Sequence, residues 1–183
     1  MVSADLSGSV LVGSGLAIAG RGFVYSLTAT NSAPAIRGIG VTNIPLGTGT
    51  GAMATTVSGL TSLQAYSFRG YATNSAGVAY SETGTFIAGF PPTVAIPSSY
   101  GITASTATLG GNVISDEGLA IAERGVVYSL TATNANPLIG GTGVTKVPVI
   151  GTTGLFATGI TGLSPTTGYS FKAFATNAVG TGY

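Results

Sequence analysis

Few side chains in this sequence can do chemistry. Of 183 residues, five are Asp or Glu and six are Lys or Arg, and the chain has no His and no Cys. No Ser therefore has an imidazole base and no pair of carboxylates recurs, so neither a catalytic triad nor general acid–base catalysis is expected. Zinc and most transition metals also lack their usual ligands. We predict no catalytic residue, no cofactor and no metal site, and we do not expect an enzyme.

The sequence consists of two copies of one pattern. Tyr25 recurs as Tyr128, Pro34 as Pro137, Tyr66 as Tyr169 and Gly77 as Gly180, always 103 positions later, so no insertion separates the copies. About half of residues 4–80 are identical to residues 107–183. A period near 100 residues is too long for a solenoid repeat and fits a whole β-sandwich domain. The sequence therefore predicts two domains, residues 1–90 and 91–183.

Two polar clusters could still carry a site. Asp116 and Glu117 could begin a calcium site, because hard cations bind several oxygen ligands, but the matching residues 13–14 are Gly and Ser. Lys146 and Asn177 could form an intramolecular cross-link, but the first copy has Asn43 in place of the lysine. The carboxylates are better interpreted as part of a solvated turn, and the cross-link is disfavoured.

Short apolar runs separated by turn residues predict β-strands throughout. In the second copy the expected strands are residues 92–97, 107–114, 121–129, 144–150 and 155–160 and a strand beginning at Tyr169, and the first copy adds 82–88. Prolines fence residues 92–97, as is typical of an edge strand. About seven strands per copy, joined by short turns and without a helical period, indicate a sandwich of two sheets.

Successive residues of the strand that begins at Tyr169 fall on alternate faces of the sheet. Tyr169 and Phe171 fall on one face, and Lys172 and Phe174 on the other. Tyr71, which matches Phe174, and Phe174 itself are candidate assembly contacts, because exposed aromatic residues on a sheet often mark an interface. The alternative is that a loop of the same domain covers both rings. Further candidate contacts lie at the junction of the two copies: Phe86, Ile87, Val94 and Ile96.

The segment from Leu163 to Tyr169, Leu-Ser-Pro-Thr-Thr-Gly-Tyr, followed by alternating Phe171, Ala173 and Ala175, resembles the E–F corner and strand F of a fibronectin type III domain. The resemblance implies an all-β fold of two tandem Ig-like or fibronectin type III-like β-sandwich domains. It also implies a tyrosine corner, in which the hydroxyl of Tyr169 bonds to the backbone upstream.

The first copy keeps Leu60 and Tyr66 but has Ser62 where the proline would lie, and neither copy has the Trp of the family's strand B. The chain thus resembles a divergent branch of the family. Residues 123–129 further resemble a variant that is common in tandem arrays of bacterial surface proteins. The resemblance implies a secreted or surface-exposed bacterial protein without enzymatic activity.

The two copies are complementary at their outer ends. The first copy begins to match at Ala4 and lacks a counterpart of residues 91–106, whereas the second ends its match at Tyr183 and lacks a counterpart of residues 81–89. The chain could be a window of a longer array, or separate subunits could donate strands to each other. Either arrangement is expected to give an elongated, head-to-tail assembly.

The charge and hydropathy of the chain limit the classes of partner that can be expected. Charged residues make up 6% of the chain, against about 25% in ordinary soluble domains, and the net charge is +1. No nucleic-acid partner is expected at that charge, and no apolar run is long enough to span a membrane as a helix. We expect a structural segment of an extracellular filament or surface stalk, whose partners are copies of itself or adjacent repeats. The alternative is an adhesin that binds a glycan or protein through residues 27–40 and 130–143.

Overall fold

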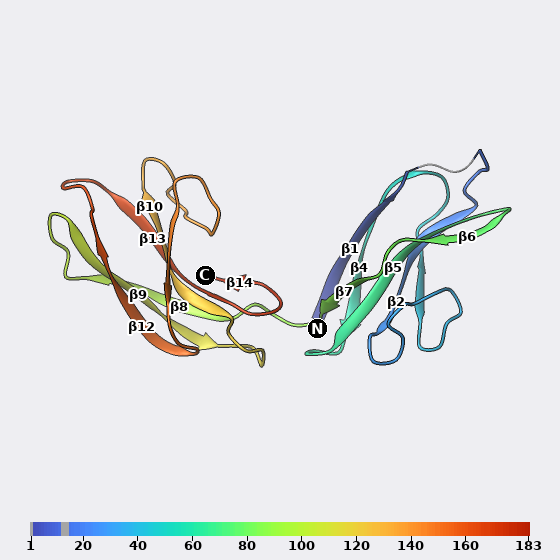
Figure 1. The fold of residues 1–183 in the computed structure, drawn as a ribbon, viewed down its shortest axis with the longest axis horizontal. Helices are drawn as coiled ribbons and strands as arrows, with labels where there is room; N and C mark the ends of the chain where they lie inside the picture. Colours follow the sequence, from blue (N-terminus) through green and yellow to red (C-terminus); the bar gives the residue numbers. More distant parts are fainter. Residues whose placement is uncertain (1, 12–14) are drawn as a thin grey trace. The chain divides into compact units, whose positions relative to one another are not determined.

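The chain folds into two compact units, Met1–Gly89 and Phe90–Tyr183, each described here by itself (Figure 1). The computed structural model describes residues 2–11 and 15–183, so residues 13–14, which match Asp116 and Glu117, lie outside the described part. The described residues form strands, turns and loops and contain no helix. Within those same ranges there is accordingly no helix that is long and apolar enough to cross a membrane.

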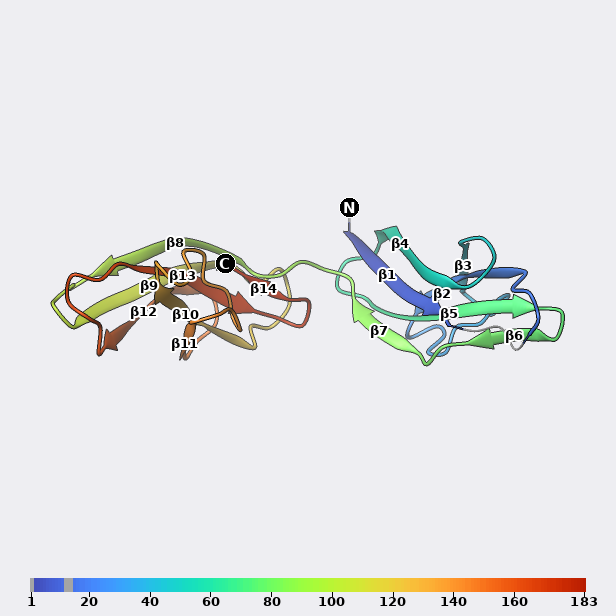
Figure 2. The same ribbon diagram turned by 90° about the horizontal axis from the view of Figure 1, so that it is seen from above.

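Unit 1 is built from two antiparallel sheets. Its strands are β1 (Val2–Val10), β2 (Gly20–Leu27), β3 (Thr42–Pro45), β4 (Gly51–Leu60), β5 (Ala65–Asn74), β6 (Gly77–Tyr80) and β7 (Gly84–Ile87). β1 pairs with β4 in the smaller sheet. The larger sheet has the order β3-β2-β5-β6, and β7 also pairs with β5. Figure 2 shows β7 and β6 as consecutive segments along the same side of β5.

Unit 2 repeats this plan, except that its smaller sheet has an additional strand and its described residues include no counterpart of β7. Its strands are β8 (Thr93–Tyr100), β9 (Thr106–Ser115), β10 (Glu123–Leu130), β11 (Thr145–Val149), β12 (Gly154–Thr161), β13 (Tyr169–Thr176) and β14 (Thr181–Gly182). The sheets have the orders β12-β9-β8 and β11-β10-β13-β14. This pairing is that of an Ig-like sandwich. The predicted fold class, all-β with two tandem Ig-like or fibronectin type III-like β-sandwich domains, is confirmed.

The two units differ at one edge of each sheet. β8 extends the β12-β9 sheet of unit 2, whereas β1 in unit 1 pairs only with β4 among the described residues. Conversely, β7 lies against the first half of β5 in unit 1, and the described part of unit 2 has no strand in that position on β13. Each unit therefore has a paired edge where the other has an unpaired one.

β8 is longer than the sequence indicates. The prolines predicted a strand that ends at Pro97, but β8 continues to Tyr100. Its pairing with β9 shifts register between Ala95 and Ser98, and Ile96 within this bulge has φ of 53°. Such a conformation is rare for a β-branched residue, and the extra residue of the bulge lets the strand pass Pro97 without a ladder hydrogen bond. The predicted edge position is correct, since β8 is the outer strand.

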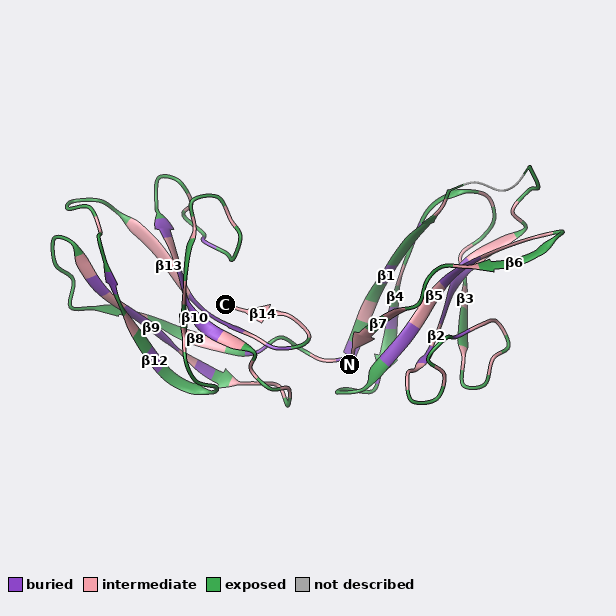
Figure 3. Cartoon of the chain, viewed as in Figure 1, coloured by how far each residue is buried: buried purple, intermediate pink, exposed green. Residues whose placement is uncertain are grey.

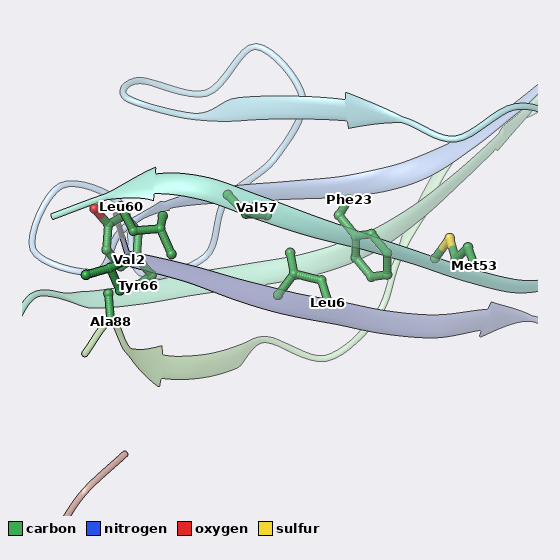
Figure 4. Close-up of a cluster of buried hydrophobic side chains, with 8 residues drawn as sticks. All are labelled: Val2, Leu6, Phe23, Met53, Val57, Leu60, Tyr66 and Ala88. Carbon is green, nitrogen blue, oxygen red and sulfur yellow. The ribbon is translucent and has the colours of Figure 1, made fainter. Parts of the chain in front are cut away.

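Each unit has its own apolar core between its two sheets. Eight buried residues form the core of unit 1 (Figure 4): Val2, Leu6, Phe23, Met53, Val57, Leu60, Tyr66 and Ala88. In unit 2 the core is formed by Ala107, Leu109, Val113, Val126, Phe156, Ile160, Ala173 and Ala175. Buried segments lie along the middle of the strands and exposed ones in most of the turns (Figure 3). Every core residue of unit 1 except Ala88 comes from a strand present in both units.

Candidate functional site

The charged groups of the described residues are dispersed. No group of three or more His, Cys, Asp or Glu is close enough to hold a metal ion within residues 2–11 and 15–183. Asp116 and Glu117 bond locally: Asp116 accepts from the N–H of Gly118, and Glu117 accepts from the hydroxyl of Thr93 at 2.7 Å. These carboxylates therefore stabilise the turn between β9 and β10 and its contact with β8.

The residues of the disfavoured cross-link have other partners. Lys146 donates to the carboxylate of Glu123 at 2.8 Å. The amide of Asn177 donates to the carbonyl oxygens of Phe90 and Asp116 at 2.9 and 3.2 Å, and its oxygen accepts from Val179. Asn177 thus fastens the start of unit 2 to the turn between β13 and β14.

The corner residues occupy equivalent positions in the two units. The backbone N–H of Thr61 donates to the hydroxyl of Tyr66 at 3.0 Å, and that of Ser164 donates to the hydroxyl of Tyr169 at 3.1 Å. Leu60 and Tyr66 are 7% and 6% exposed. Leu163 and Tyr169, in contrast, are only half-buried. The same local hydrogen bond therefore forms whether or not the neighbouring apolar surface is covered.

The assignment of Tyr71 and Phe174 as exposed assembly contacts is wrong. Both side chains are on the outward face of their sheet, opposite the core, but Tyr71 is 6% exposed and Phe174 is 0% exposed. On the same faces Val24 and Val127 are completely buried. These positions already have a cover within their own unit, which corresponds to the alternative that a loop shields them.

The loops after β2 and β10 pack against these outer faces. Pro34 and Pro137 within these loops are fully buried. In unit 2, a Cβ on the loop residue Gly143 would lie 3.4 Å from the hydroxyl of Ser129, an outward residue of β10. The loop thus packs against the outer face of the sheet near the end of β10.

A second tyrosine, whose role the sequence pattern alone did not indicate, fixes each loop. The backbone N–H of Ile36 donates to the hydroxyl of Tyr80 at 2.9 Å, and Ile139 donates to Tyr183 at 3.0 Å. A cation lies over each ring: Arg69 is 4.6 Å from the centroid of Tyr80, and Lys172 is 5.5 Å from that of Tyr183. Identity of the tyrosine in both copies is the signal that could have revealed this role.

The loops of the alternative binding function have the same backbone hydrogen bonds. In residues 27–40 and the adjoining turn, Thr30 and Asn31 donate to Leu27, and Gly38 donates to Ala35. The same three bonds recur in residues 130–143, with donors and acceptors shifted by 103 positions. The two loops are therefore alike in conformation as well as in sequence, and neither has diverged into a separate binding structure.

An apolar groove of about 480 Å³ lies in unit 2 beside the first half of β13. Its walls include Tyr128, Leu163, Tyr169 and Phe171, the half-buried rings and leucine at the edge of the core. The matching surface of unit 1 is covered by β7. There Phe86 stacks on Tyr66 with ring centroids 5.5 Å apart and an interplanar angle of 14°.

A second groove of about 540 Å³ lies in unit 1 between β1 and the β5–β6 hairpin. Residues 7–10 line it, and the matching residues of β9 in unit 2 pair with β8. Gly77 and Ala79 also line it. In unit 2, a Cβ on their counterparts Gly180 and Gly182 would lie 3.5 Å from Pro91 and against the carbonyl of Pro92, respectively. Each groove therefore lies where the other unit has a strand.

The remaining candidate contacts lie on these two strands. Phe86 and Ile87 of β7 are half-buried against β5, and Val94 of β8 is half-buried against the core of unit 2. Ile96 is 68% exposed. Thus Ile96 presents free apolar surface, whereas the other three are partly used within their own units.

Among the comparisons with known proteins, only those with solved structures found similar proteins. No protein-family model matches the chain, and no curated protein matches it. A crystal structure of chicken CNTN1 FN1–FN3 domains is similar with 16% identity and a TM-score of 0.48, over 90% of this chain and 52% of that one. Domains A168–A170 of titin are similar with 13% identity and a TM-score of 0.41, over 99% and 55%. The chain spans about half the length of each.

Proposed function

We propose that the chain is a structural segment of an extracellular filament or long surface stalk, in which β-sandwich units follow one another head to tail. One observation carries the proposal: residues 84–100 contain β7, which closes unit 1, and β8, which closes unit 2. Unit 1 has a groove where a counterpart of β8 would lie, and unit 2 has a groove where a counterpart of β7 would lie. A unit of this design is completed on both sides only when connecting segments precede and follow it.

The proposed role is mechanical. Each unit buries its own core, and strands at the junctions join it to the next unit. Partners are accordingly adjacent repeats or further copies of the chain. The likeness of residues 123–129 to arrays of bacterial surface proteins supports a location outside the cell or on its surface.

The alternative, an adhesin that binds glycan or protein through residues 27–40 and 130–143, is less well supported. A binding loop at the tip of an adhesin is expected to differ from its counterpart in a supporting repeat. Here the two loops have the same hydrogen bonds and the same buried proline. This likeness favours a structural role for both.

Electron microscopy and sedimentation velocity of the protein at micromolar concentration test the proposal. We expect uniform fibres or concentration-dependent linear oligomers. Ile96→Lys should weaken them, because it places a charge on the exposed apolar residue of β8. Ile150→Lys is the matched control, since Ile150 is 99% exposed and lies outside the junction.

Other outcomes discriminate between the functions. Dispersed monomers that bind selectively to a glycan array would support the adhesin instead. Fibres that respond equally to the Ile96 and Ile150 substitutions would exclude the junction strand as the contact. The unfolding midpoint of each variant in urea should be measured in parallel, so that loss of assembly is not confused with loss of the fold.

A further inference from the structure

The groove in unit 2 is suited to bind an extended strand. It lies beside the unpaired edge of β13, which pairs with β14 only at Ala175 and Thr176 in the described structure. The groove is lined by apolar and aromatic groups at its base, and by residues 164–167 of the corner at one side. An unpaired strand edge beside an apolar groove is the arrangement used in β-augmentation, where the backbone supplies affinity and pockets supply specificity.

Unit 1 shows how such a site is filled. β7 runs antiparallel to β5, with Phe86 opposite Tyr66, Thr85 opposite Ser67 and Gly84 opposite Phe68. The ring of Phe86 also lies 6.0 Å from that of Phe68. After the strand, Ala88 accepts from the N–H of Leu63, donates to the carbonyl of Gln64 and is buried in the core.

The corresponding groups of unit 2 are in place to receive such a segment. Tyr169 and Phe171 match Tyr66 and Phe68. The corner residues Thr166 and Thr167 match Leu63 and Gln64, and Thr166 has φ of 54° where Leu63 has 63°. The corner therefore has the same unusual backbone conformation before the strand arrives, so the site is already formed.

We infer that the groove of unit 2 is the docking site for an extended segment with the chemistry of β7, carried by a neighbouring repeat. The segment enters antiparallel to β13, with an aromatic residue stacked on Tyr169. After the aromatic residue, a small apolar residue takes the position at the corner of unit 2 that Ala88 has in unit 1. This inference rests on the proposed head-to-tail function and specifies its contact: the occupant is a strand, and the ring of Tyr169 is its anchor.

A peptide with the sequence of residues 81–89 tests the inference on the full chain. Labelled with a fluorophore, it should bind saturably with one site per chain in an anisotropy titration. Replacing its phenylalanine by alanine should weaken binding at least tenfold, because the stacked ring is the largest apolar group in the contact. A scrambled peptide should not bind. Absence of saturable binding, or equal binding of all three peptides, would overturn the inference.

A matched pair of variants locates the site. Thr167→Glu places a charge at the rim of the groove and should weaken peptide binding severalfold. Gln64→Glu makes the equivalent change in unit 1, where β7 already occupies the edge, and should leave binding unchanged. Equal effects of the two substitutions would mean that the peptide does not bind at β13.

Disulfide trapping fixes the register, and the chain has no cysteine of its own to interfere. A peptide with cysteine in place of Thr85, activated as a mixed disulfide, should label the Ser170→Cys variant, because Ser170 matches Ser67, which faces Thr85 in unit 1. The Ser67→Cys variant should label poorly, since β7 occupies that position. Equal labelling of both variants, or no labelling of either, contradicts the proposed register.

The failure of this inference is distinguishable from failure of the proposed function. Fibres formed by a chain that does not bind the peptide would overturn the strand site alone. A chain that binds the peptide in register but forms no linear assembly would retain the site and overturn the filament. In the peptide-free protein, a cross-link between Ser170→Cys and Thr85→Cys chains would identify β7 of a second copy as the segment that fills the groove, in agreement with the inference.

Discussion

The two units share a corner but differ in how well that corner is covered. The hydroxyls of Tyr66 and Tyr169 each accept a hydrogen bond from the backbone N–H five residues upstream, at 3.0 and 3.1 Å. Yet Tyr66 is buried under β7, whereas Tyr169 lines an open groove. The hydrogen bond is thus a property of the local sequence, while burial of the ring depends on a strand from elsewhere.

The outer faces of the larger sheets show the opposite behaviour. There the two units agree closely: Val24 and Val127 are both completely buried, and Pro34 and Pro137 are both buried in the covering loop. The cover comes from within the same repeat, so it is present in both. The comparison separates what a repeat supplies for itself from what it takes from a connecting segment.

The largest expected effect concerns a residue whose cover is supplied within the repeat. Phe174→Ala should destabilise unit 2 by about 3–5 kcal/mol, because it removes a fully buried ring. Urea unfolding followed by hydrogen exchange, analysed separately for residues 1–89 and 90–183, would measure it. Phe174→Leu is the control and should cost about 1 kcal/mol, since most of the volume is retained. A loss below about 0.5 kcal/mol for the alanine variant would indicate an exposed ring.

The next effect concerns the strand that only unit 1 has. Phe86→Ala should destabilise unit 1 by about 2 kcal/mol, less than a full core ring because Phe86 is half-buried. Unit 2 should be unchanged. In that variant the ring of Tyr66 should become partly exposed, as the ring of Tyr169 is. The NMR chemical shifts of the two rings would report this change. Unchanged stability of unit 1 would show that β7 does not close its core.

Much of this architecture could be predicted from the sequence, because strands, turns and the corner are encoded locally. The 103-residue repeat and the Leu–Tyr spacing were sufficient for the fold class. The burial of Tyr71 and Phe174 could not be predicted, because alternation along a strand gives the face and not what covers it. The loop that packs on the same face is held by Tyr80 in unit 1 and Tyr183 in unit 2, far away in the sequence.

The site shows the same limit. Alignment of the copies predicts that each lacks one outer strand, but not that the missing partners leave open grooves, of which the one in unit 2 is lined by Tyr169 and Phe171. A core could equally have collapsed into the space, and only the side-chain positions exclude it. Similarly, the prolines marked β8 as an edge strand but gave its end wrongly, since the bulge at Ile96 lets the strand continue.

A smaller effect tests whether the corner is independent of β7. Tyr66→Phe and Tyr169→Phe each remove one hydroxyl and its hydrogen bond, and each should cost about 1 kcal/mol in its own unit. The two losses should agree within about 0.5 kcal/mol, although the rings differ in burial. Urea denaturation of both variants, again analysed unit by unit, measures the difference. A much larger loss in unit 1 would mean that β7, rather than the local sequence, holds the corner.

The smallest effect is expected where the units differ in charge. Lys146 pairs with Glu123 at 2.8 Å on the surface of unit 2, and the matching residues of unit 1 are Asn43 and Gly20. Lys146→Asn should change the stability of unit 2 by less than about 0.5 kcal/mol, because the pair is partly exposed and each side chain must be ordered to form it. Thermal unfolding at low and at high salt measures this, and the variant should lose what salt dependence the pair confers. A loss above about 1 kcal/mol would make the ion pair a structural requirement of unit 2, one that unit 1 meets without charge, and the units would then be stabilised by different means at the same edge of the sheet.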